Sequence, residues 1–145
     1  MIYCGYQGVG KSTYCRNHPN TTIDLDSSAF KKEELWEVAY VNQALALMYS
    51  TGKDVFISAH SCVIEQLASL DAPLIILIPG MNKDAWKSRL EFRYYKNPTE
   101  PNLKAVYDFI KNFDKDMEFY KECETAGCKV KKVTATVITD IEDFI

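Results

Sequence analysis

The clearest chemical signal in the sequence lies near its amino end. Residues 5–13 match the pattern G-x-x-x-x-G-K-[ST], which is typical of a loop that binds nucleotide phosphates. Glycines in such a loop adopt positive φ angles and let backbone N–H groups approach phosphate oxygens. Lys11 supplies positive charge for the β- and γ-phosphates, and the hydroxyl of Ser12 can bind Mg²⁺. The residues predicted to bind the nucleotide are Gly8, Val9, Gly10, Lys11, Ser12 and Thr13.

The residues on either side of this loop support the assignment. The apolar residues 2–4 predict a short strand before the loop, and residues 13–18 predict a helix after it. Residues 17–20 include a proline and end that helix. A helix in this place turns its positive end toward a bound phosphate. A glycine-rich turn that precedes a lysine by chance is the alternative, and it would not require strand, loop and helix in this order.

Two acidic residues follow the second predicted strand. Residues 21–26 are rich in β-branched side chains and end in Asp24 and Asp26, which lie two residues apart and so share a face of a strand. At the carboxyl edge of a sheet, two carboxylates can serve Mg²⁺, directly or through water, and accept hydrogen bonds from a hydroxylated acceptor. The alternative is an exposed acidic strand end, followed by Ser27 and Ser28 as a helix cap.

A third segment, residues 83–96, combines cations with aromatic residues and predicts a helix. Arg89 and Arg93 are four residues apart and are therefore neighbours on one helical face. Transfer of a phosphoryl group needs positive charge that closes over the γ-phosphate and excludes water, so we expect residues 81–99 to form a lid. Lys87 is a weaker candidate on the same helix. The alternative is a solvated amphipathic helix whose arginines pair with nearby acids.

Strand-like and helix-like segments alternate along the rest of the chain. Further strands are predicted at 55–57, 74–78 and 129–137, and helices at 28–49, 63–70, 83–96 and 102–125, with a turn or helix at 141–145. Continuous apolar strands separated by helices are typical of a parallel sheet that is covered on both faces. We therefore expect one α/β domain over residues 1–145. It is a three-layer α/β/α sandwich with a mostly parallel sheet of about five strands, and the phosphate loop lies at the carboxyl edge.

Length and composition narrow the class of protein. A chain of 145 residues that is 47% hydrophobic can bury one substantial core. It has no apolar run near the ~20 residues that span a bilayer, and no secretion signal precedes the first strand, so we expect a cytoplasmic protein. The net charge of −3 argues against nucleic-acid or membrane-surface partners. Five cysteines without a framework-like spacing fit a reducing compartment, and we expect no structural metal.

Taken together, these features resemble the small P-loop kinases, the group of adenylate, shikimate and gluconate kinase-like enzymes that includes compact nucleotide kinases. The resemblance rests on the early phosphate loop, the Asp-x-Asp after the second strand and the basic helix after the fourth, and it covers nearly the whole chain. It implies a P-loop NTPase fold, with ATP and Mg²⁺ as cofactors. It also implies that Asp24 lies on the metal side with Ser12, that Asp26 contacts the acceptor, and that Arg89 and Arg93 are lid arginines.

The sequence departs from some related patterns. No strand ends in the apolar run plus aspartate of a strong Walker B motif, so metal binding would depend on Ser12, water and the pair of Asp24 and Asp26. The Asp-Gly-Phe-Pro-Arg segment of adenylate kinase is absent. Residues 82–85 are Asn-Lys-Asp-Ala, whereas guanine recognition by a GTPase requires Asn-Lys-x-Asp. An ATP-dependent kinase is therefore the favoured function, and its acceptor is expected to be a nucleoside or nucleotide.

Several roles remain open at this point. The residues predicted to be catalytic are Lys11, Asp26, Arg89 and Arg93. A nucleotide-binding regulator or slow NTPase without a small-molecule acceptor is the alternative function. His60 can orient a phosphate or hydroxyl at the acceptor edge or serve as a structural loop histidine, and Trp36 and Tyr40 can stack a nucleobase or pack against the sheet. The oligomeric state cannot be read from the sequence.

Overall fold

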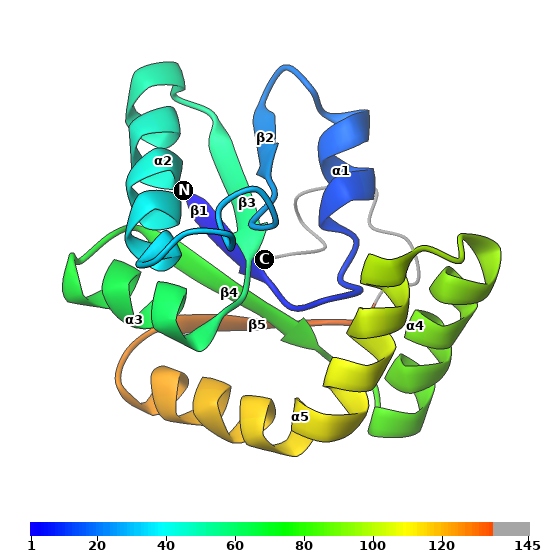
Figure 1. The fold of residues 1–145 in the computed structure, drawn as a ribbon. Coiled ribbons are helices and arrows are strands. Elements are labelled where there is room, and N and C mark those ends of the chain that lie inside the picture. The colour runs from blue at the N-terminus through cyan, green and yellow to red at the C-terminus, as the bar shows by residue number, and fades with distance from the viewer. Residues whose placement is uncertain (135–145) are drawn as a thin grey trace.

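The computed structural model describes residues 1–134, which form a five-stranded, all-parallel sheet with the strand order β2-β3-β1-β4-β5 (Figure 1). The strands are β1 (Ile2–Gly5), β2 (Thr22–Leu25), β3 (Asp54–Ser58), β4 (Leu74–Pro79) and β5 (Lys129–Val133). The helices are α1 (Lys11–Asn17), α2 (Trp36–Thr51), α3 (Ser61–Ser69), α4 (Lys83–Lys96) and α5 (Glu100–Thr125). The α/β fold is thus confirmed. The end of the strand predicted at 129–137, and the turn or helix predicted at 141–145, lie outside the described residues.

Helices cover both faces of the sheet because each parallel connection needs a right-handed crossover. On one face, Tyr14 of α1 packs on Phe56 of β3, whose ring stacks on Tyr3 of β1 at 4.6 Å. On the other face lie α2, α3 and α5 (Figure 1). The central strand β1 is buried along its whole length, and five residues of β4 are buried as well. The continuous apolar runs of the sequence therefore form the middle of the sheet.

The helix predicted at 28–49 begins later than expected, at Trp36. Residues 27–35 form turns instead, in which the carbonyl of Ser27 accepts hydrogen bonds from the backbone N–H groups of Phe30 and Lys31. Leu35 then adopts a left-handed conformation with φ 55°, which a helix interior does not allow. The prediction for residues 28–35 is wrong because the apolar spacing of the helix continues into a segment whose backbone forms hydrogen-bonded turns instead. This segment borders the candidate site.

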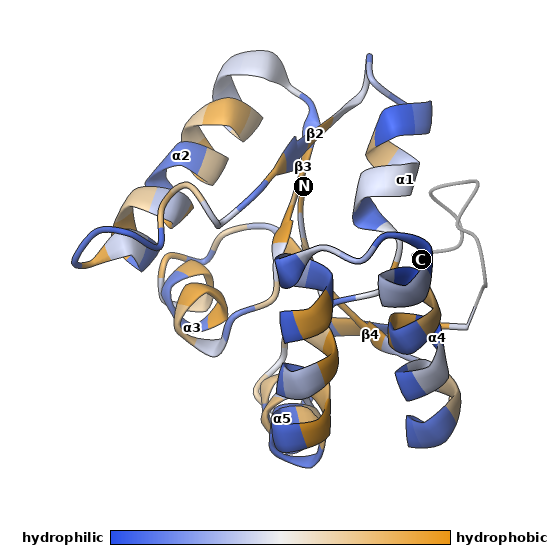
Figure 2. Cartoon of the chain, turned by 45° about the vertical axis from the view of Figure 1, so that its right-hand side comes forward, coloured by the Kyte–Doolittle hydropathy of each residue, from blue (hydrophilic) through white to orange (hydrophobic). Residues whose placement is uncertain are grey.

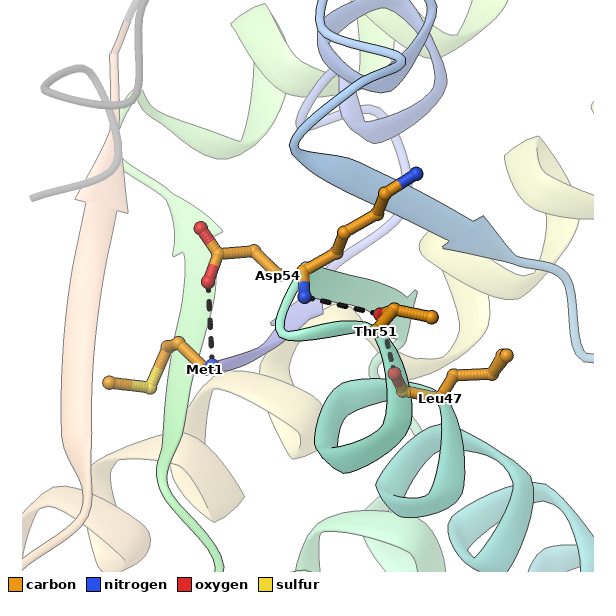
Figure 3. Close-up of polar contacts among 5 residues, drawn as sticks. Met1, Leu47, Thr51 and Asp54 are labelled. Atoms are coloured by element: carbon orange, nitrogen blue, oxygen red, sulfur yellow. Dashed lines mark hydrogen bonds and ion pairs between the residues drawn. The ribbon is translucent and has the colours of Figure 1, made fainter.

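At the amino-terminal ends of β1 and β3, away from the carboxyl edge of the sheet, a set of polar contacts connects α2 to β3 (Figure 3). The hydroxyl of Thr51 donates to the carbonyl of Leu47 at 2.6 Å and accepts a hydrogen bond from the backbone N–H of Lys53 at 3.1 Å. The amino group of Met1 lies 3.4 Å from a carboxylate oxygen of Asp54. These contacts close the end of α2 and hold the start of β3 beside the start of β1.

The long helix α5 is amphipathic, with apolar and polar residues on different sides (Figure 2). Ala105, Val106, Phe109 and Tyr120 are buried on its inner side. Thr99 caps the helix by accepting a hydrogen bond from the backbone N–H of Asn102. Within residues 1–134, no helix has the length and apolar character that crossing a membrane requires.

Candidate active site

The phosphate loop is curved and compact, as its glycines allow. Gly8 and Gly10 have φ angles of 88° and 97°, which lie in the region that favours glycine. Val9, in the middle of the loop, is fully buried, and its N–H donates to the carbonyl of Tyr6 at 3.2 Å. Lys11 then folds back so that its Nζ lies 3.4 Å from the carbonyl oxygen of Gly5. The backbone therefore forms a concave turn with a lysine at its centre.

Lys11 is surrounded by charges of both signs. Burial lowers the pKa of its ammonium group, the charge of Asp24 opposes this shift, and the charge of Arg93 adds to it. Asp26 also raises the pKa of Lys11, so both predicted carboxylates lie close enough to act on it. Two buried or partly buried cations that act on each other disfavour one another's charge, and an anion between them would relieve that repulsion. The site is electrostatically suited to phosphate.

The hydroxyl of Ser12 donates a hydrogen bond to Oδ2 of Asp24 at 2.8 Å. Ser12 lies in the first turn of α1 and Asp24 near the carboxyl end of β2, so the crossover from β1 to β2 brings together residues that are distant in sequence. Both groups supply oxygen atoms, which are the ligands that Mg²⁺ prefers. Within residues 1–134, no group of three or more histidine, cysteine, aspartate or glutamate side chains is arranged to hold a metal. A cation here would need further oxygen ligands from a nucleotide or water.

A cleft of about 830 Å³ opens at the carboxyl edge of the sheet. One wall is formed by the phosphate loop, including Lys11, and by the segment 26–28 after β2. Residues 58–62, from the end of β3 to the start of α3, and one side of α5 line the rest of it. Asp26 lines this cleft and accepts a hydrogen bond from the backbone N–H of Ser28 at 3.0 Å. The volume lies within the range of small-molecule sites, roughly 300–1,000 Å³.

The two predicted lid arginines differ in position. Arg93 lines the cleft, and its Nε is buried without a hydrogen bond of standard geometry to the described residues. Burial lowers the pKa of Arg93. Arg89 lies over the ring of Trp86, with 4.7 Å between its guanidinium carbon and the ring centre, and it is not among the described residues that line the cleft. The structure therefore brings Arg93, but not Arg89, to the cleft beside Lys11.

Trp86 joins α4 to the phosphate loop, a contact that the sequence analysis did not predict. Its Nε1 donates to the carbonyl of Gln7 at 2.9 Å, and its side chain is fully buried. Leu90, one turn later on α4, is fully buried too. A Cβ added to Gly8 would lie 2.8 Å from Cδ2 of Leu90 and 3.3 Å from Nε1 of Trp86, so the loop and the helix are in close contact. The spacing of Trp86 and Leu90 by four residues was the signal available in the sequence.

His60 lines the cleft. Its Nε2 is 3.3 Å from the hydroxyl of Ser27, and its ring meets Trp36 edge-on at 5.3 Å. Burial lowers the pKa of His60 to about 4, helped by the positive charges of Lys31, Lys11 and Lys104, so the ring is neutral near pH 7.

Tyr40 has a structural position. It is fully buried, and its hydroxyl donates to the carbonyl of Leu25 at 2.6 Å and accepts from the backbone N–H of Ser58 at 2.9 Å. These contacts connect the ends of β2 and β3 and so hold Asp26 and His60 at one edge. Packing against the sheet, the second of the two roles considered for Tyr40, is what the structure displays.

The wall formed by α5 contains polar residues that the sequence analysis missed. Lys104, Asp108, Asn112 and Asp116 follow one another at intervals of four residues and all line the cleft. We call these four residues the α5 polar face. Residues four apart lie on one side of a helix, so the repeated spacing of polar residues beside the apolar stripe was a usable signal. The sequence analysis considered only the apolar side of this helix.

Comparisons with known proteins bear on the fold. No protein-family model matches the sequence, and no curated protein matches it significantly. Among solved structures, the chain is similar to a shikimate kinase from Bacteroides thetaiotaomicron, with a TM-score of 0.52 and 15% sequence identity over 90% of this chain and 83% of that chain. At this level of identity, the likeness is one of fold. The chain therefore has the α/β fold of a small P-loop kinase, as the resemblance in its sequence predicted.

Proposed function

We propose that the protein is a Mg²⁺-dependent phosphotransferase that moves the γ-phosphoryl group of ATP to a compact acceptor, a nucleoside or nucleotide. The observation that carries the proposal is the shared cleft: Lys11 of the phosphate loop, Asp26 and Arg93 line one cavity that continues to α5. A protein that only hydrolyses or senses a nucleotide needs no second compartment beside the phosphates. The kinase-like fold supports the same class of reaction.

In this proposal the donor phosphates are bound by Gly8, Val9, Gly10, Lys11, Ser12 and Thr13. Backbone N–H groups of the curved loop and the ammonium of Lys11 hold the phosphate oxygens. Arg93 contributes positive charge from α4, beside Lys11, where negative charge develops during transfer. We retain Arg89 as a lid candidate that needs a side-chain movement to reach the cleft, because its guanidinium lies over Trp86.

Ser12 would hold the magnesium ion as a direct ligand, and Asp24 would hold it directly or through water. When bound, Mg²⁺ neutralises charge on the β- and γ-phosphates and fixes their orientation. The hydrogen bond between Ser12 and Asp24 holds both oxygen atoms in place beside the loop. This small donor set suits a cation that retains several water and phosphate ligands.

Asp26 is the proposed acceptor-side residue. A hydroxyl acceptor would donate its proton to the carboxylate of Asp26, which acts as a general base. A phosphate acceptor is already nucleophilic, and Asp26 would then orient it or a bound water. Asp26 is exposed to the cleft and is positioned by the N–H of Ser28, so it is available for either role.

A slow NTPase or nucleotide-binding regulator is the second candidate. The observation in its favour is that β3 and β4 end in Ser58 and Pro79, so neither supplies a carboxylate to a metal at its carboxyl end. In both candidates we take residues 1–145 as one domain and place the protein in the cytoplasm.

Acceptor-dependent turnover tests the proposal. The protein would be incubated with Mg²⁺-ATP, alone and with a panel of nucleosides and nucleoside monophosphates, while ADP release and phosphorylated products are measured. We expect ADP release to be stimulated by an acceptor, to require Lys11 and to fall strongly in Lys11→Ala but not in Lys32→Ala, a control lysine outside the cleft. Turnover that no acceptor stimulates supports the NTPase instead. An unchanged rate in Lys11→Ala would refute the proposed donor site.

A further inference from the structure

We infer that the α5 polar face, together with Lys31, selects the acceptor, and that the acceptor is a nucleoside 5′-monophosphate rather than a neutral nucleoside or sugar. This inference rests on the proposed function and names the substrate class of that same cleft. It follows from the order of the side chains along the cleft and from the charges that face one another there.

The first observation is a pair of cations that come from two different segments of the chain. Lys31 belongs to the turns after β2 and Lys104 to the first part of α5, and both line the cleft. Neither forms an ion pair with any described residue within 4.0 Å. Each lysine acts on the same group, because both lower the pKa of His60. Burial and the charge of Lys104 lower the pKa of Lys31, and the charges of Asp108 and Asp26 oppose that shift only in part. An anionic group between Lys31 and Lys104 would remove this repulsion.

The second observation is a change of character further along the same helix. Asp108, Asn112 and Asp116 follow Lys104 and present carboxylate and amide oxygens, which accept hydrogen bonds. With a rise of 1.5 Å per residue, Lys104 and Asp116 are separated by about 18 Å along the helix axis. The face can therefore contact both ends of an elongated molecule: an anion near Lys104, and N–H or O–H donors near the acids.

A buried hydroxyl lies beside the acids of the α5 polar face. Tyr6 lines the cleft and is 3% exposed, and its hydroxyl lies near the side chain of Gln7, which also lines the cleft. Burial raises the pKa of Tyr6, a hydrogen bond with the side chain of Gln7 lowers it, and the charges of Asp116 and Asp108 raise it further, so the ring lies near these acids. The hydroxyl of Tyr6 therefore adds a polar group to the part of the cleft near Asp116.

A nucleoside monophosphate has the required distribution of groups. Its phosphate fits the pair of Lys31 and Lys104, and its ribose hydroxyls and base N–H groups fit the oxygens of Asp108, Asn112 and Asp116. The phosphate would lie beside Asp26 and His60, since Asp26 acts on Lys11 as well as on Lys31. A neutral nucleoside lacks the first group, and a hydroxy acid lacks the base.

Binding and transfer measured in matched pairs test the inference. Each nucleoside would be compared with its 5′-monophosphate, and shikimate and gluconate would represent hydroxy acids. Binding is measured by calorimetry on the Mg²⁺-ADP complex, and KM and kcat are measured with Mg²⁺-ATP. We expect monophosphates to bind about ten- to a hundredfold more tightly than their nucleosides, as loss of a charged hydrogen-bond pair predicts. Lys31→Gln and Lys104→Gln should remove most of this difference and leave nucleoside binding within about twofold.

Two control variants on α5 separate recognition from general effects on the helix. Lys111→Gln and Glu118→Gln alter exposed residues that do not line the cleft, and both should bind monophosphates as the unaltered protein does. Asp116→Asn should change the preference among bases. Equal use of nucleosides and monophosphates, transfer to hydroxy acids alone, or unaltered monophosphate binding in Lys104→Gln would overturn the inference. Monophosphate binding that depends on Lys104 without any phosphoryl transfer would support it and would reject the proposed kinase activity.

Discussion

Replacing Trp86 with phenylalanine tests whether helix α4 holds the phosphate loop in its binding conformation. The change removes the hydrogen bond from Nε1 of Trp86 to the carbonyl of Gln7, which is 2.9 Å long. A partly buried carbonyl that loses its partner costs about 1–3 kcal/mol. The smaller ring also leaves space in a fully buried position, which adds about 1–2 kcal/mol. We expect the free energy of unfolding to fall by about 2–5 kcal/mol in total.

The same change should weaken nucleotide binding. With Gln7 released, the phosphate loop would have to be ordered by the nucleotide itself, so we expect Kd for Mg²⁺-ATP to rise about tenfold, which corresponds to roughly 1.4 kcal/mol. Calorimetric titration measures this Kd, and denaturant unfolding measures the stability of the same sample. Both are needed, because the two effects have different causes.

Leu90→Ala is the matched comparison. Leu90 packs on the same side of α4 and is fully buried, so its truncation should cost about 2–5 kcal/mol of stability while the hydrogen bond to Gln7 remains. We expect its Kd for Mg²⁺-ATP to change far less than that of Trp86→Phe. If both variants lose stability and bind Mg²⁺-ATP as tightly as the unaltered protein, Trp86 serves only to fill the core and the reasoning fails.

Three further predictions concern single residues. Gly8→Ala should destabilise the protein by more than Gly52→Ala in denaturant unfolding, because both have positive φ but only the Cβ at Gly8 meets a neighbour within 3 Å. His60 has a folded pKa of about 4 against an ordinary value of 6.5, so the stability that its neutral ring contributes is complete above pH 6.5 and is lost as the pH falls toward 4. This loss should reach up to about 3 kcal/mol in the unaltered protein. In denaturant unfolding over the same pH range, His60→Gln should not show it. Ser12→Ala should raise the Mg²⁺ concentration needed for half-maximal turnover severalfold, and an unaltered Mg²⁺ dependence would exclude Ser12 as a ligand.

Much of the fold could be predicted from local sequence alone. The apolar runs at 55–57 and 74–78 have no alternative to burial, and the residues between them carry helical spacing, so an alternating α/β order with a parallel sheet follows. The helix predicted at 28–49 was wrong over its first third, because positive φ at Leu35 and the turns at Ser27 depend on local hydrogen bonds that apolar spacing does not reveal. Periodicity identifies elements better than it locates their ends.

The donor half of the candidate site could be predicted because it is local in sequence. The phosphate loop is a continuous motif, and its curvature follows from Gly8 and Gly10. Asp24 could be paired with Ser12 only through the expected crossover, and the structure places them 2.8 Å apart. The catalytic and metal-binding roles of these residues remain predictions.

The acceptor half could not be predicted in the same way, because it is assembled from distant segments. Much of the cleft beyond the phosphate loop is lined by α5, which lies about ninety residues later in the chain. Nothing in the local sequence of Lys104 or Asp116 indicates which strand edge this helix faces. That depends on how α4 and α5 pack after β4, and hence on buried side chains such as Trp86.

The packing of α4 also restricts how the cleft can close. Moving the whole helix away from the loop would expose Trp86 and Leu90, at a cost of about 3–6 kcal/mol. A lid motion of the entire segment 81–99 would therefore be rare unless substrate binding supplied that energy. Side-chain movement of Arg93 carries no such cost, and neither does movement of the turns at 27–35, which carry Lys31 and are mostly exposed. Closure over the substrates is thus expected to come from the acceptor side, while α4 keeps the phosphate loop fixed and holds Arg93 beside it.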